Sequence, residues 1–336
     1  MRTWLLKRFA QAVVTIWAVI TITFALTRFL PGGPVDFMKA RLIRQGQTVD
    51  EERLNQLAEI YTNINPELPL HEAYIDYISR LLSGNMGQSV YNQEPVSTIL
   101  ADAVPWTVFL MSVSVTFMFA VGIIFGATMA YAEGSRFDSV LSTVSTVTMA
   151  VPYYIFAVLF LYYFGFIKGW FPTGSKHASG VPPSVSIEFF RSAIWHAVLP
   201  AAAIVIPGIG APALQMRGNS IQVLGEDYLR VARLRGLPSL TIATRYVGRN
   251  SILPMYTNFL IRLGIYFGGA VILEQIFSYT GVGFYMFQAI NTRDYPLMMG
   301  SFIVLTVAVV LAILVADMTY GKLDPRVSAG GERESY

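Results

Sequence analysis

The chain has 336 residues, of which 54% are hydrophobic and only 13% are charged, with a formal net charge of +3. Soluble proteins carry about 25% charged residues, so this composition excludes an ordinary soluble domain and indicates an integral membrane protein. The chain has no cysteine, which excludes a disulfide scaffold, a thiolate nucleophile and a cysteine zinc site. The three histidines form no HExxH pair, and the net charge is too small to indicate nucleic acid as a partner.

Six apolar stretches are long enough to cross a bilayer, because a spanning helix needs about 20 mostly apolar residues. The sequence therefore predicts an all-α integral membrane protein with six transmembrane helices. The first stretch is too long for the apolar region of a signal peptide and has no cleavage site, so we expect a retained span. The six predicted spans are Phe9–Leu30, Thr107–Tyr131, Val140–Ile167, His196–Met216, Tyr256–Leu273 and Gly300–Met318.

The segment between the first two spans, residues 31–104, is too long for a simple turn. Apolar residues recur at helical spacing from Leu54 to Tyr61 and again from Leu70 to Leu81. This pattern predicts a helical cap on the outer membrane face, and a disordered loop is the alternative.

The rest of the chain divides around this cap. Residues 1–30 hold the N-terminus and the first span, residues 105–318 a five-helix core with a cytoplasmic connection at 217–254, and residues 319–336 a cytoplasmic tail. The stretch Gly169–Trp195 is rich in glycine, proline and serine, which predicts an irregular outer loop.

Lysine and arginine gather in segments that six spans would place on one side of the membrane. The short loops predicted for the opposite side carry few of them. We therefore predict that both termini and the connection 217–254 face the cytoplasm, in a multi-pass protein of the cell (plasma or inner) membrane. The basic residues on the predicted inner side include Arg2, Lys7, Arg8, Arg217, Arg230, Arg233, Arg235, Arg245, Arg249, Lys322, Arg326 and Arg333.

The most informative stretch runs from Gly225 to Pro238, inside the cytoplasmic connection. Acidic residues stand where a helix would begin and arginines where it would end, which complements the helix dipole. Gly236 supplies a stop signal and Pro238 prevents continuation. The pattern predicts a short helix over residues 226–236, which is marginal alone and needs a docking partner. The alternative is an anchor that lies on lipid headgroups.

This stretch, followed by Arg249–Pro254, resembles the cytoplasmic loop of permease subunits in binding-protein-dependent ABC importers, most closely the B-type subunit of the dipeptide/oligopeptide permease family. The resemblance extends over most of the chain, in order. The other matching segments are Leu5–Arg8, Leu30–Pro34, Gly84–Ser89, Pro95–Val96, Gly268–Ala270, Glu274, Ile276–Ser278, Gly281–Gly283, Asn291–Pro296 and Leu323–Arg326.

The resemblance implies the type I ABC importer permease fold, with the short loop helix as a coupling helix in a groove of an ATPase subunit. It also implies a heterodimer with a homologous second permease subunit, two ATP-binding cassette ATPase subunits and an extracellular solute-binding protein. The small residues Ala232 and Gly236 permit close approach, and Leu229, Val231, Ala232 and Leu234 are expected to form one apolar face. The predicted ATPase-coupling residues are Glu226, Asp227, Tyr228, Arg230, Ala232, Arg233 and Gly236.

The chain has no GxxxxGK[ST] phosphate loop. The pairs Gly208–Gly210 and Gly281–Gly283 are expected to serve close helix packing or turns rather than nucleotide binding. No serine–histidine–aspartate set or paired carboxylates stand out within the spans, so we predict no catalytic residue and no metal site. We expect this chain to bind no cofactor, with ATP and Mg²⁺ on the partner ATPase subunits.

Arg262 is the clearest ionisable residue within a predicted span, about 12 Å above Pro254 along a helix. Such residues are costly in lipid and are usually functional, so we predict that Arg262 lines the translocation pathway; a structural pair with a partner subunit is the alternative. We include Pro207 and Gly210 in this pathway because prolines and glycines make the fourth span irregular, and we also assign Tyr266 to it. Glu274 and Asp317 are expected at headgroup level.

The predicted function is that of a transmembrane permease subunit of an ATP-driven importer. Di- and oligopeptides are the cargo that we predict first. The same machinery importing oligosaccharides, nickel or another small solute remains an alternative. A stand-alone ion-coupled transporter would require internal repeats and acidic residues within the spans, which the sequence does not present. An integral-membrane enzyme lacks a plausible set of reacting residues.

Overall fold

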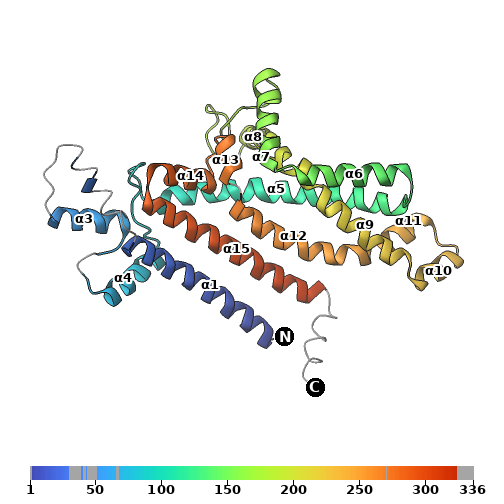
Figure 1. Cartoon of the computed structure of the whole chain (residues 1–336), viewed down its shortest axis with the longest axis horizontal. Coiled ribbons are helices and arrows are strands. Elements are labelled where there is room, and N and C mark those ends of the chain that lie inside the picture. The colour runs from blue at the N-terminus through green and yellow to red at the C-terminus, as the bar shows by residue number, and fades with distance from the viewer. Residues whose placement is uncertain are drawn as a thin grey trace. The chain divides into compact units, whose positions relative to one another are not determined.

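The computed structural model describes residues 2–29, 39–40, 43, 51–65, 68–269 and 271–323 (Figure 1). Within these ranges the regular structure is helical, with an isolated antiparallel bridge between Gln88 and Pro95. Parts of the predicted cap, the matching residues 30–34, Ala270 and the predicted tail from residue 324 lie outside them.

The helices follow the apolar stretches of the sequence closely. They are α1 (Arg2–Phe29), α3 (Glu51–Thr62), α4 (Leu70–Leu82), α5 (Val96–Tyr131), α6 (Arg136–Ala150), α7 (Tyr153–Phe160), the π-helix η1 (Leu161–Ile167), α8 (Ile187–Gly208), α9 (Gly210–Leu224), α10 (Asp227–Leu234), α11 (Ser239–Thr241), the π-helix η2 (Ile242–Gly248), α12 (Arg249–Gly269), α13 (Val271–Ile276), α14 (Val282–Thr292) and α15 (Tyr295–Leu323).

Four of the described helices are long and apolar enough to cross a membrane: Leu6–Phe29, Val96–Tyr131, Ile187–Gly208 and Tyr295–Thr319. A fifth span is formed if α6 and α7–η1 are taken together. The predicted fifth span overlaps α12 and α13, which are not among these candidate spans. The helical fold class is therefore confirmed, and the described helices contain four or five candidate spans.

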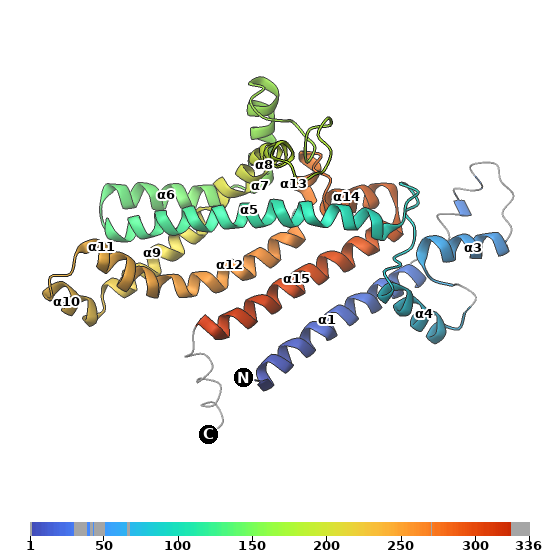
Figure 2. The same ribbon diagram turned by 180° about the vertical axis from the view of Figure 1, so that it is seen from behind.

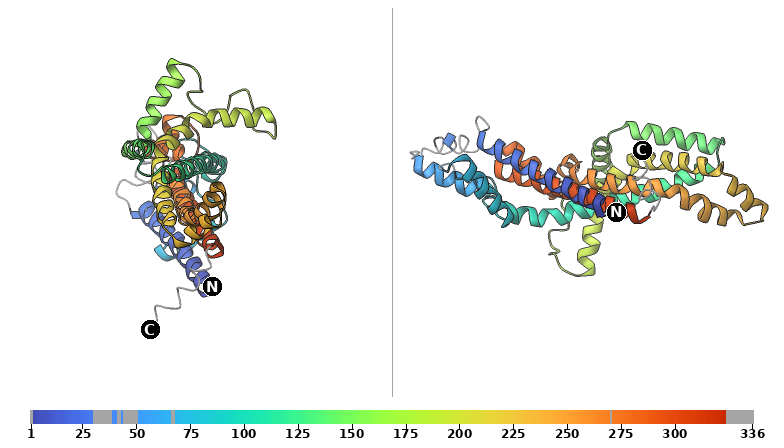
Figure 3. Two further views of the ribbon diagram at one scale, coloured as in Figure 1. Left: turned by 90° about the vertical axis from the view of Figure 1, so that its right-hand side faces the viewer. Right: turned by 90° about the horizontal axis from the view of Figure 1, so that it is seen from below.

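The predicted third span, Val140–Ile167, is not one straight helix. The chain turns by 90° between α6 and α7–η1, and Figure 3 shows α7 pointing away from the direction of α6. Pro152 follows α6 and has no N–H to continue it. The preceding Val151 is extended (φ −94°, ψ 121°), as residues before proline prefer.

The predicted outer loop Gly169–Trp195 is also too long by nine residues at its end. Helix α8 begins at Ile187, because the hydroxyl of Ser186 accepts a hydrogen bond from the Phe189 N–H at 3.2 Å and caps the helix. Residues 187–195 are therefore helical, and the irregular segment ends at Ser186.

The chain forms two compact units. The first holds residues 109–266 and the end of α15 from residue 312, and the second holds residues 2–108 and 267–311. In the first unit, α5, α6 and α9 lie side by side (Figure 2). Glycines permit this approach: a Cβ on Gly122 would lie 2.6 Å from the Pro212 ring, and one on Gly210 would collide with the backbone oxygen of Ser145.

The second unit contains the described part of the predicted cap. Helices form where the periodicity predicts them, as α3 and α4. The Phe24 ring of α1 packs on Tyr74 and Tyr77 of α4, with centroids 5.2 and 5.6 Å apart. Arg80 donates to Glu59 of α3 at 2.7 Å, and this bond raises the pKa of the guanidinium. Burial raises the pKa of Tyr77 to about 12.

Candidate functional site

The predicted short helix of the cytoplasmic connection is present as α10. It begins after Glu226, whose backbone is extended (φ −74°, ψ 139°), and its cap residue is Arg235. Gly236 then adopts φ +69°, a left-handed conformation that residues with a Cβ avoid. Glycine therefore ends the helix as its position predicts, whereas the Glu226 side chain makes no capping hydrogen bond.

One side of α10 is anchored inside the first unit. Leu229 is 0% exposed and Ala232 is 3% exposed, and they pack with Ile242 and Val247 of η2. The prediction of a single apolar face was wrong, because Val231 and Leu234 are 54% and 81% exposed. Residues 229 and 232 share one helix face, while residues 231 and 234 lie on another, since each step turns the helix by about 100°.

The opposite side of α10 is open and amphipathic. Val231 and Leu234 supply its apolar part, and the exposed polar residues on α10 and its flanks supply the rest. Of the predicted coupling residues, only Ala232 is turned inward. The exposed ones are Glu226, Asp227, Tyr228, Arg230, Arg233 and Gly236. The Tyr228 hydroxyl also accepts a 2.8 Å hydrogen bond from the Asn250 side chain, which ties α10 to the start of α12.

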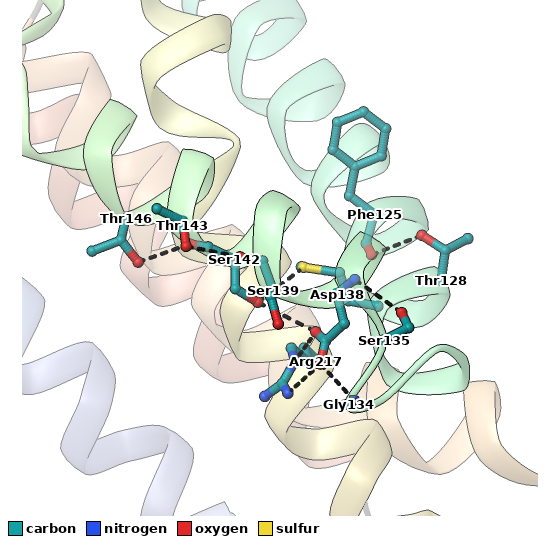
Figure 4. Close-up of polar contacts among 11 residues, drawn as sticks. Phe125, Thr128, Gly134, Ser135, Asp138, Ser139, Ser142, Thr143, Thr146 and Arg217 are labelled. Atoms are coloured by element: carbon teal, nitrogen blue, oxygen red, sulfur yellow. Dashed lines mark hydrogen bonds and ion pairs between the residues drawn. The ribbon is translucent and has the colours of Figure 1, made fainter.

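A largely buried ion pair joins α9, the helix that leads into α10, to α6 (Figure 4). Arg217 of α9 donates from Nε to Oδ1 of Asp138 at 2.6 Å and from Nη2 to Oδ2 at 2.7 Å. The two side chains are 29% and 4% exposed. Such paired bonds fix both distance and orientation, so the middle of α9 is held to the start of α6.

The carboxylate of Asp138 is itself fixed by the turn that joins α5 to α6. It accepts bonds from the Gly134 N–H at 3.1 Å and the Ser142 hydroxyl at 3.3 Å, while its own N–H donates to Ser135 Oγ at 3.2 Å. Sequence analysis missed this pair. The spacing of Ser135 and Asp138 is that of a helix capping box, which could have located the helix start, although not the arginine.

Arg262 and Tyr266 lie one turn apart on α12 and therefore share a face. Arg262 is partly buried, and its guanidinium makes no hydrogen bond or ion pair with any part of the chain that the structure describes. The Tyr266 hydroxyl lies 4.0 Å from Met118 Sδ of α5. Within the described ranges, no carboxylate therefore pairs with Arg262.

The other predicted pathway residues separate into two places. Pro207 is buried in α8, and a Cβ on the adjacent Gly208 would lie 3.8 Å from the Tyr266 hydroxyl. Gly210 instead faces α6, where its missing side chain admits the backbone of Ser145. The structure thus brings Tyr266 close to the Pro207–Gly208 region and places Gly210 in a helix contact.

Glu274, which was expected at headgroup level, is 0% exposed in the second unit. Its Oε1 accepts from the Thr107 hydroxyl at 2.6 Å and its Oε2 from the Phe284 N–H at 3.0 Å. The carboxylate therefore caps α14. A Cβ on Gly281 would lie 2.5 Å from both carboxylate oxygens, so the glycines of this GxG pair serve close packing, as predicted.

A second buried carboxylate, Asp294, joins two of the matching segments. It accepts from the Ser89 hydroxyl at 2.5 Å, from the Tyr91 N–H at 3.0 Å and from the Leu297 N–H at 3.3 Å. Asp294 thus caps α15 and holds the segment before α5. Among the residues that the structure describes, no group of three histidine, cysteine or acidic residues could hold a metal ion.

Comparison with known sequences agrees with the family resemblance described above. Residues 122–329 match the model of a family described as "Binding-protein-dependent transport system inner membrane component". The "Di/tripeptide transport system permease protein DppB" of Pseudomonas aeruginosa (strain UCBPP-PA14) is 28% identical over 340 residues, covering 97% of this chain and 99% of that protein.

Two further relatives align over nearly their whole lengths. The "Oligopeptide transport system permease protein AppB" of Bacillus subtilis (strain 168) is 28% identical, covering 97% of this chain and 99% of its own. The "Inner membrane ABC transporter permease protein YejB" of Escherichia coli O157:H7 is 27% identical, covering 98% and 100%. The chain therefore aligns with permease proteins from end to end.

Proposed function

The chain belongs to the family of binding-protein-dependent transport system inner membrane components, and we propose that it forms half of the pathway of an importer for di- and oligopeptides. As a member of this family it is an inner-membrane permease subunit of an ABC importer, and ATP hydrolysis takes place on separate subunits. The peptide cargo is supported by the relatives named for di/tripeptide and oligopeptide transport. An oligosaccharide or another small solute is the alternative cargo.

The exposed side of α10 is the proposed docking surface for one ATPase subunit, and it is the observation that carries this proposal. A short helix anchored by Leu229 and Ala232 and open at Val231 and Leu234 is rigid on one side and free to bind on the other. Exposed apolar side chains rimmed by charges are typical of an interaction surface. The charged rim is formed by Asp227, Arg230 and Arg233.

The proposed topology has six spans with both termini in the cytoplasm and the type I importer fold. The bent pair α6 and α7–η1 serves as the third span, and α12 with α13 as the fifth. This arrangement places the arginine-rich connection on the inner side, in agreement with the distribution of basic residues. It also places α3 and α4 outside, as a cap that would contact the solute-binding protein.

The complete transporter would contain a homologous second permease subunit and two ATPase subunits, which bind the ATP and Mg²⁺. The two permease subunits would enclose the pathway between them. Arg262 and Tyr266 would line this subunit's share, because the guanidinium has no partner in the described chain and α12 presents both side chains on one face. An arginine there suits a peptide carboxylate or carbonyl group, since guanidinium binds such oxygens with several donors.

The decisive experiment reconstitutes the chain with its partner permease, ATPase pair and binding protein in proteoliposomes. We expect peptide-loaded binding protein to stimulate ATP hydrolysis and ATP to drive peptide uptake. Stimulation by an oligosaccharide-loaded binding protein alone would replace the proposed cargo. Solute uptake by this chain without any ATPase would contradict the importer itself.

The docking surface has its own test. Leu234→Asp replaces a leucine that is 81% exposed with a charged residue. The subunit is therefore expected to fold but no longer to copurify with the ATPase pair. Leu240→Asp, at a residue that is 75% exposed on α11, is the matched control and should retain it. Equal copurification of both variants would contradict docking through α10.

A further inference from the structure

Helix α10 is joined to α9 by packing as well as by the chain. Only Gly225 and Glu226 separate the two helices. Val223 and Leu224, at the end of α9, pack against the buried Leu229 and Ala232 side of α10. A displacement of α10 therefore acts directly on α9, because two residues and a shared apolar cluster leave little freedom between them.

Helix α9 is in turn packed closely against α5 and α6. A Cβ on Gly126 of α5 would collide with the backbone oxygen of Ala213 and lie 2.5 Å from the Met216 Cβ. On the α6 side, the backbone of Ser145 occupies the place of a Gly210 side chain. Glycine contacts of this kind fix how near the helices lie, but an apolar contact by itself leaves them able to slide or rotate.

The Asp138–Arg217 pair opposes both movements at the middle of α9, two turns before α10 begins. Two parallel hydrogen bonds, at 2.6 and 2.7 Å, define the position and the rotation of Arg217 relative to the carboxylate. The carboxylate is held by Gly134 and Ser142, so it belongs rigidly to the α5–α6 turn. Arg217 is thus fastened to a fixed point rather than to a mobile side chain.

We infer that Arg217 and Asp138 are positioning residues that make α10, α9 and the α5–α6 hairpin move as one body, so that a push on α10 reaches the second and third spans. This inference rests on the proposed function, in which an ATPase moves α10. It assigns a role in energy coupling to two residues that contact neither the cargo nor the nucleotide. Without the pair, α9 would follow α10 while α6 lagged behind.

The test uses the complete transporter in proteoliposomes and measures peptide transported per ATP hydrolysed. Arg217→Met keeps an unbranched stem and removes both hydrogen bonds, and Asp138→Asn removes the charge at nearly constant shape. For each variant we expect this ratio to fall about fivefold or more, a typical size for coupling between two sites, while ATP hydrolysis continues. Arg136→Gln, at an exposed arginine two residues from Asp138, is the matched control and should leave the ratio unchanged.

A distance measurement separates a positioning role from general loss of stability. The chain has no cysteine, so spin labels can be attached at Ser139→Cys on α6 and Gln222→Cys on α9, both exposed positions, in complexes whose other subunits lack cysteine. With the natural pair, the distance should stay the same with and without ATP. With Arg217→Met the distance should change when ATP is added, and with Arg217→Lys this change should be smaller.

The outcomes distinguish the inference from the proposed function. Absence of ATP-dependent uptake in the unaltered complex would overturn the function. A second outcome would overturn only the positioning role of Arg217 and Asp138. In it, the unaltered complex shows normal uptake, while an assembled Arg217→Met complex keeps the same transport ratio and the same label distance. If Arg217→Met fails to assemble, Arg217→Lys provides the test, because it keeps the charge and loses the paired geometry. An unchanged transport ratio and an unchanged label distance in that variant would also overturn the positioning role.

Discussion

The hydroxyl of Thr107 and the carboxylate of Glu274 lie 2.6 Å apart although 167 positions separate them in the chain. The same hydroxyl accepts the Val282 N–H at 2.9 Å, while the carboxylate accepts the Phe284 N–H. The two side chains therefore accept hydrogen bonds from two backbone N–H groups in the first turn of α14. This arrangement fastens α14 to α5 and α13 within the second unit.

Thr107→Val should destabilise the protein because it removes the hydrogen bond to Oε1 of the buried Glu274 and the acceptor of the Val282 N–H. We expect a loss of about 1–3 kcal/mol in unfolding free energy, the usual cost of an unsatisfied buried polar group. Thermal unfolding of the detergent-solubilised subunit measures it. Thr107→Ser keeps the hydroxyl and is expected to unfold near the original temperature; equal losses in both variants would contradict the role of the hydroxyl.

Gly281→Ala should be destabilising for a different reason. Its Cβ would lie 2.5 Å from both oxygens of Glu274, so the carboxylate must move and lose its hydrogen bonds. Overpacking of this kind costs about 1–3 kcal/mol. Gly180→Ala is the matched control, because a Cβ there meets nothing within 4 Å. The same melting experiment compares the two, and similar melting temperatures would show that α14 tolerates the extra carbon.

Asp294→Ala should loosen the segment that precedes α5. The substitution removes the acceptor of the Ser89 hydroxyl and of the Tyr91 N–H, as well as the N-terminal cap of α15. A lost cap alone costs about 1 kcal/mol. Limited proteolysis should cut near residues 84–93 faster than in the unaltered protein, and an unchanged cleavage rate would show that Asp294 does not hold this segment.

Gly236→Ala should weaken the end of α10. The backbone there has φ +69°, and a Cβ in this region costs about 1 kcal/mol. We expect reduced copurification of the ATPase pair because the open face of α10 is no longer held in one orientation. Gly236→Asn, which tolerates left-handed backbone better than alanine, should retain more of the partner; a reversed order would contradict the backbone explanation.

Arg262→Leu should separate transport from ATP hydrolysis. If the guanidinium meets cargo in the pathway, peptide uptake should fall about tenfold, equivalent to about 1.4 kcal/mol, while ATP hydrolysis by the complex continues. Arg262→Lys keeps a positive charge and is expected to retain part of the uptake. Unchanged uptake in Arg262→Leu would remove the pathway role and favour a structural contact with the second permease subunit.

Local signals in the sequence predict local structure well in this protein. The apolar lengths locate α1, α5, α8 and α15, and Gly236 ends α10 where its position indicates. The helical spacing from Leu70 to Leu81 predicts α4. These features depend on residues close together in the chain, so a single sequence contains what is needed to find them.

Contacts between distant residues could not be found in the same way. The partners of Glu274 and Asp138 lie 167 and 79 positions away, and no spacing rule relates them. Pro152 marks a helix break in the sequence, but no local pattern predicts the 90° turn, after which α7 packs against α8. The single apolar face predicted for α10 failed because η2, which covers only Leu229 and Ala232, could not be placed.

The exposure of Val231 and Leu234 also bears on how the transporter is assembled in the cell. If the ATPase covers α10 as proposed, a permease subunit produced in excess of its ATPase leaves the apolar side chains of Val231 and Leu234 exposed to water, beside the exposed arginines of the same helix. Such a surface favours unwanted association and recognition by degrading enzymes until its proper partner covers it. The amount of stable permease should therefore follow the supply of ATPase, whatever the rate at which the permease gene is expressed.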